Sequence, residues 1–168
     1  MHHVAPTFTT AELPEQFRAL SEAYLEGAER LSSELASAAW EPNYHRGQVA
    51  MWLAFHATEL FLKACVRRAA PGVLKNVHSL GELRLEFASH YPGLVFEPPF
   101  GPEPVPADWM LMEMVLESDK TAHEQLRYPV GRQNAPWGGV RTFEPSSFRS
   151  EVRQLRADIE RVSREVFK

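Results

Sequence analysis

Apolar residues recur along most of the chain at spacings of three and four, the period of an α-helix that buries one face. This pattern predicts long helices over about residues 11–39, 44–70, 106–126 and 146–167, and a short helix that opens at Ser79. Ser79 and Glu82 have the spacing of a capping box. No stretch alternates convincingly with the period of two that indicates a half-buried strand. The sequence therefore predicts an all-α bundle of four long helices and one short helix.

The helices differ in how their apolar residues are distributed. The second helix is apolar around nearly its whole circumference, which predicts that it lies at the centre of the bundle. The last helix has one clean core stripe: Phe148, Val152, Leu155, Ile159, Val162 and Val166. The expected stripe of the first helix is Phe17, Leu20, Tyr24, Leu31 and Leu35, and that of the short helix is Leu80, Leu83 and Phe87.

Proline and glycine separate these elements. Pro71 and Gly72 are expected to stop the second helix. Residues 92–106 contain six prolines, which forbids a helix there, so we expect a stiff crossing over the surface.

Composition narrows the class of protein. A chain of 168 residues with 44% hydrophobic residues is long enough for one domain with a real core and too short for two, so we expect a single domain over 1–168. A lone cysteine, Cys65, excludes an internal disulfide and a multi-cysteine metal site. No apolar run approaches the ~20 residues of a membrane span, and the first residues lack the pattern of a signal peptide. We therefore expect a cytoplasmic protein that does not enter a membrane.

Charge is unevenly distributed along the chain. Residues 1–126 hold nine basic and 17 acidic side chains, whereas residues 127–168 hold nine basic and five acidic ones. The basic end is nearly all arginine, whose guanidinium suits forked contacts with phosphate or carboxylate. One interpretation is a surface that binds anions or nucleic acid. The other, which the local spacing favours, is a solvated helix face on which opposite charges follow at steps of four, as in Arg156, Glu160 and Arg164.

Two sets of ionisable residues interrupt the apolar helices. His56, Glu59 and Lys63 share one face of the second helix and form either a pocket carboxylate with an orienting lysine or a salt bridge at the end of the bundle. Asp119, His123 and Arg127 follow at steps of four and suit either acid–base or anion chemistry, or a network that caps the helix. One hypothesis makes Arg127 and His123 an anion-binding corner that Lys63 completes.

Standard chemical motifs are mostly absent. The chain lacks a phosphate-cradling glycine loop, a Gly-x-Ser-x-Gly elbow and a His-Glu-x-x-His pair. His78, His90 and His123 do not have metal-ligand spacing. We expect neither a metal nor a cofactor.

Three segments together resemble the HEPN family, the nucleotide-binding domains of higher eukaryotes and prokaryotes. They are Ala54–Ala64 with Glu-Leu-x-x-Lys-Ala, Val77–Leu83 with His-x-Leu-x-x-Leu, and Leu126–Pro129 with Arg-Tyr-Pro before a final amphipathic helix. The resemblance covers about residues 48–168. It implies a helical bundle that often forms a homodimer, pairs with a nucleotidyltransferase in toxin–antitoxin systems, or cleaves RNA without a metal.

Three functions remain open on this basis. The first is a non-catalytic binding module for a nucleotide-like or other anionic ligand or a partner protein, with these candidate contacts: His56, Glu59, Lys63, His78, Asp119, His123, Arg127 and Tyr128. The second is a ribonuclease whose Arg-x(4–6)-His motif departs from the family's pattern. Its residues would be either Arg84 and His90, or His123 and Arg127, where the histidine precedes the arginine. The third is a structural interaction protein whose contact segment is the proline-rich crossing.

Overall fold

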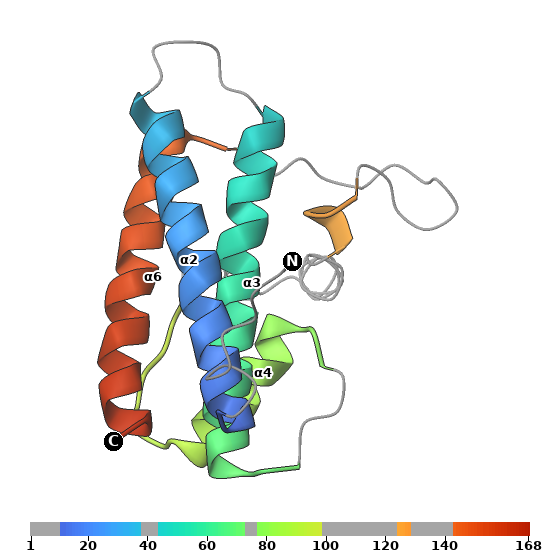
Figure 1. Cartoon of the computed structure of the whole chain (residues 1–168), viewed down its shortest axis with the longest axis vertical. Coiled ribbons are helices and arrows are strands. Elements are labelled where there is room, and N and C mark those ends of the chain that lie inside the picture. The colour runs from blue at the N-terminus through green and yellow to red at the C-terminus, as the bar shows by residue number, and fades with distance from the viewer. Residues whose placement is uncertain (1–10, 38–43, 73–76, 99–123, 129–142) are drawn as a thin grey trace, which may run out of the picture.

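Three long helices lie side by side, and a short helix packs against the third of them along the row in Figure 1. This computed structural model describes residues 11–37, 44–72, 77–98, 124–128 and 143–168. The long helices are α2 (Leu13–Ser37), α3 (Tyr44–Ala69) and α6 (Pro145–Val166), and the short one is α4 (Leu80–His90). α3 and α6 both run antiparallel to α2 (Figure 1). No strand occurs in these described ranges, so the predicted all-α bundle is confirmed.

The helix ends follow the capping chemistry of the sequence. Ser79 caps α4, where its hydroxyl accepts a hydrogen bond from the Glu82 amide at 3.2 Å. Glu144 caps α6 and its carboxylate accepts bonds from the amides of Ser146 and Ser147. α3 ends before Gly72, whose φ of 100° is accessible to glycine at little cost. Of the helix expected over 106–126, residues 106–123 lie outside the described residues, and Glu124 and Gln125 are helical.

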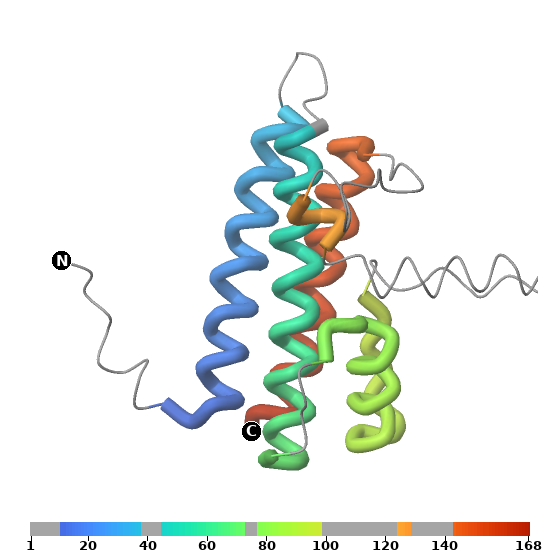
Figure 2. Tube along the Cα trace, turned by 90° about the vertical axis from the view of Figure 1, so that its right-hand side faces the viewer, coloured from blue at the N-terminus to red at the C-terminus, as the bar shows by residue number. Residues whose placement is uncertain are grey.

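α3 is the central helix, as its all-round apolar sequence predicts. It packs against α2, α4 and α6, and Figure 2 shows it between α2 and the other two. Most of its residues from Ala50 to Val66 are buried. By length and composition α3 is the one described helix that could cross a membrane, but most of it is buried inside the bundle. That burial is what the core helix of a soluble protein shows.

The buried face of α2 differs from the expected stripe. Leu20 is 39% exposed, and Phe17, Tyr24 and Leu31 are half-buried. The fully buried positions are instead mostly small: Ser21, Leu25, Ala28, Ser32 and Leu35. The buried Ser21 hydroxyl donates a hydrogen bond to the Ala57 carbonyl of α3 at 2.7 Å. Of the predicted stripe, Leu35 is buried and Tyr24 and Leu31 pack against the core, whereas the choice of Leu20 was wrong.

The other core predictions are confirmed. All six stripe positions of α6 are buried, and so are the three inward residues of α4. The segment after α4 is more than a surface crossing, because Phe96 inserts into the core against Phe61 and Phe87. Residues 99–106 of the expected crossing lie outside the described residues.

Candidate functional site

A buried carboxylate on α3 is the centre of the candidate site. Glu59 is 2% exposed, and its Oε1 accepts a hydrogen bond from Lys63 Nζ at 2.6 Å. His78, in the segment before α4, places its Nδ1 2.9 Å from the same oxygen. His56 places its Nδ1 3.5 Å from Oε2. The shared helix face predicted for His56, Glu59 and Lys63 is therefore present, and His78 joins it from another element.

The electrostatics of Glu59 follow from these neighbours. Burial alone would raise the pKa of its carboxyl, but the contacts with His56 and Lys63 outweigh burial and hold the pKa at about 2. An ionised carboxylate can only accept hydrogen bonds, so His78 donates through Nδ1. Lys63 is itself nearly buried and neutralises Glu59 directly. The predicted salt bridge is thus present, and the lysine is engaged in it.

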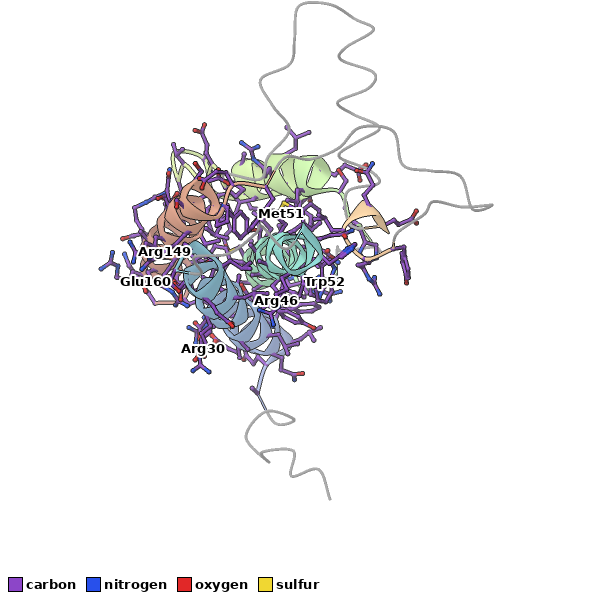
Figure 3. The ribbon with its side chains drawn as sticks, turned by 90° about the horizontal axis from the view of Figure 1, so that it is seen from above. Arg30, Arg46, Met51, Trp52, Arg149 and Glu160 are labelled. Carbon is purple, nitrogen blue, oxygen red and sulfur yellow. The ribbon has the colours of Figure 1, made fainter. Side chains whose placement is uncertain are left out.

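Aromatic rings surround His56. Its imidazole stacks on the Trp52 indole with centroids 5.3 Å apart and planes 10° apart, and it meets the Tyr24 ring edge-on at 4.7 Å. The His56 side chain is 28% exposed, so its outer edge still meets solvent. Figure 3 shows Trp52 on the side of α3 that faces the turn over residues 124–128.

Arg127 lies in that turn and completes the arrangement. Its guanidinium carbon is 6.0 Å from the centroid of the Trp52 ring and 5.4 Å from that of Tyr128. The arginine is exposed, and it forms no ion pair within the described part of the chain. The Gln48 amide donates to the Gln125 carbonyl at 2.9 Å and so ties the turn to α3. We call Trp52, His56, Arg127 and Tyr128 the aromatic corner.

Some predicted site residues are not brought into this arrangement. Asp119 and His123 lie outside the described residues. Arg84 and His90 lie on α4, six positions apart, so they point about 120° away from each other around its axis. His90 approaches Glu86 at 3.4 Å instead. Within one chain, the two residues of the forward Arg-x(4–6)-His match do not face a common point.

Sequence reasoning missed Trp52 and Tyr24. Trp52 precedes His56 by four residues, so the helical period could have placed the indole beside the imidazole. Nothing in the local sequence indicates that Tyr24 of α2 or Arg127 would reach the same rings. Among the described residues, no group of three metal-ligating side chains is placed to hold a metal ion.

Comparisons of the chain with protein-family models, with curated proteins and with solved structures find no match.

Proposed function

We propose that the protein is a non-catalytic binding module of the HEPN type that takes an anionic, nucleotide-like ligand at the aromatic corner. The observation that carries this proposal is the exposed guanidinium of Arg127 beside Trp52 and Tyr128. Contacts with ring faces leave the N–H edge of a guanidinium available for a forked contact with phosphate or carboxylate. Trp52 and the half-exposed Tyr128 add aromatic rings to the corner, and aromatic side chains are the groups that proteins use to contact bases.

Burial of the Glu59–Lys63 pair also supports Arg127 as the group that binds the anion. Lys63 and Glu59 neutralise each other inside the bundle, so the net positive charge of the corner resides on Arg127. A ligand with a negative group is attracted to the unpaired charge of Arg127. The neighbouring Trp52 indole reduces the contact of this guanidinium with water, which strengthens the attraction. Among the described residues of the corner, no nucleophilic side chain lies next to a general base.

Adenosine monophosphate is a suitable probe because it carries both a base and a phosphate. Its affinity should fall about tenfold or more in Arg127→Ala, since a hydrogen bond to a charged group contributes about 1.5–3 kcal/mol. Arg127→Lys keeps the charge but loses the fork, so we expect an intermediate affinity. Arg153→Ala is the matched control, because Arg153 is an exposed arginine on α6.

Calorimetric titration of the four proteins checks the proposal. Equal affinities in wild type and Arg127→Ala would refute it, and so would the absence of binding in wild type. Cleavage of RNA by the purified protein in EDTA would favour the ribonuclease alternative instead.

The HEPN resemblance also implies a homodimer and a nucleotidyltransferase partner, and both stay predictions. Sedimentation at micromolar concentration tests the first of them, because a monomer has a mass of 19.1 kDa.

A further inference from the structure

The histidine in the aromatic corner lies between the buried carboxylate and the indole that Arg127 contacts. His56 Nδ1 is 3.5 Å from Glu59 Oε2, and its ring stacks on Trp52. The His56 side chain is 28% exposed, so a proton from solvent can reach its ring.

From this geometry we infer that anion binding at the aromatic corner is coupled to protonation of His56. This inference rests on the proposed function and names its regulation. A protonated His56 places a second positive charge against the indole that already contacts Arg127. A bound anion therefore favours the protonated ring, and the protonated ring favours the anion by the same factor.

The groups around His56 are consistent with this coupling. On α3, Glu59 faces its Nδ1, and Lys63 already compensates the charge of Glu59. From α2, the Tyr24 ring meets the imidazole edge-on. From the segment before α4, His78 reaches the opposite oxygen of Glu59, and from the 124–128 turn Arg127 reaches Trp52. When His56 is neutral, Arg127 is the one uncompensated charge in this set, and protonation adds another.

Sulfate is the probe for the experiment, because its charge stays constant between mildly acidic and mildly alkaline pH, whereas the charge of a phosphate monoester changes. Sulfate affinity is measured by NMR titration near pH 5.5 and near pH 8. One additional charge close to the ligand should tighten binding on the order of tenfold at the lower pH. The midpoint of the His56 Cε1 shift should move to higher pH when sulfate is added.

Two variants distinguish coupling through His56 from a general effect of pH. His56→Gln keeps a polar side chain without the titrating ring, so its sulfate affinity should be nearly independent of pH. His90→Gln is the matched control, because the His90 side chain is also 28% exposed and lies at the end of α4. It should retain the pH dependence of the wild type.

The outcomes separate this inference from the proposed function. If Arg127→Ala weakens sulfate binding while His56→Gln keeps the full pH dependence, the coupling is overturned and the binding site stands. If sulfate affinity does not change with pH in the wild type, the coupling is likewise overturned. If sulfate binds equally well to wild type and Arg127→Ala, the binding site itself is overturned, and the coupling with it.

Discussion

α6 and α3 are both long helices of the bundle, but they differ in the kinds of side chain that they bury. The fully buried positions of α6 are all apolar from Phe148 to Val166, and its charged residues are half-buried or exposed. α3 is the most buried helix, yet it carries Glu59 and Lys63 inside the bundle and His56 at its edge. An apolar stripe is enough to hold a bundle together, whereas a buried ion pair contributes little net stability compared with apolar residues of similar size. The polar face of α3 places His56 beside Trp52, the indole that Arg127 also contacts.

The largest effect is expected from removing one member of the buried ion pair. Glu59→Ala leaves the Lys63 ammonium nearly buried without its carboxylate, and should cost about 3–5 kcal/mol of unfolding free energy. Replacing both Glu59 and Lys63 with leucine removes both charges and should recover most of that loss. Chemical denaturation checks both proteins. A double variant as unstable as Glu59→Ala would show that the pair itself stabilises the fold.

A core position of α6 should give a loss of similar size by a different mechanism. Leu155 is fully buried, so Leu155→Ala leaves a cavity and should cost about 2–5 kcal/mol. Leu85 on α4 is 75% exposed, and Leu85→Ala should stay within about 0.5 kcal/mol of the wild type. If the two variants have the same denaturation curve, the assignment of the α6 stripe to the core is contradicted.

Acid should lower the part of the unfolding free energy that the ionised Glu59 contributes. The pKa of Glu59 is about 2 in the folded protein and ordinarily 4.5, so its stabilising contribution is complete above about pH 4.5 and is lost as the pH falls toward 2. The contribution amounts to about 3 kcal/mol. The difference in unfolding free energy between wild type and Glu59→Gln should therefore shrink by this amount between neutral pH and pH 2. A difference that stays constant with pH would place Glu59 in an environment with an ordinary pKa.

A smaller effect is expected at the contact between α2 and α3. Ser21→Ala removes the buried hydrogen bond to the Ala57 carbonyl and should cost about 1 kcal/mol. Ser37→Ala is the matched control, because the Ser37 hydroxyl also binds a carbonyl but is exposed. Thermal unfolding of both variants measures the difference. If the two variants are equally stable, the contact between α2 and α3 does not depend on this bond.

The sequence was a good guide to the fold where apolar side chains alone determine the buried face. That condition holds for α6 and α4, and the predicted helix limits fall within about two residues of those observed. It fails for α2, because Ser21 and Ser32 are buried by close packing and carry no hydrophobic signal. A serine is equally common on a surface, so only its neighbours in space decide its position.

The candidate site could be predicted in part for a similar reason. The helical period brings Lys63 and His56 to Glu59, and those contacts are present. His78 reaches Glu59 across 19 positions of the chain, and Arg127 reaches Trp52 from a separate turn. Such contacts depend on how the helices pack, which local spacing does not encode.

Arg127→Ala tests the central claim most directly when unfolding free energy and adenosine monophosphate affinity are measured on the same protein. Arg127 is exposed, so its loss should change stability by no more than about 0–1 kcal/mol. We expect this small change together with a fall in affinity of about tenfold or more. Unchanged affinity with a loss of several kcal/mol would contradict it, because Arg127 would then serve the fold rather than a ligand.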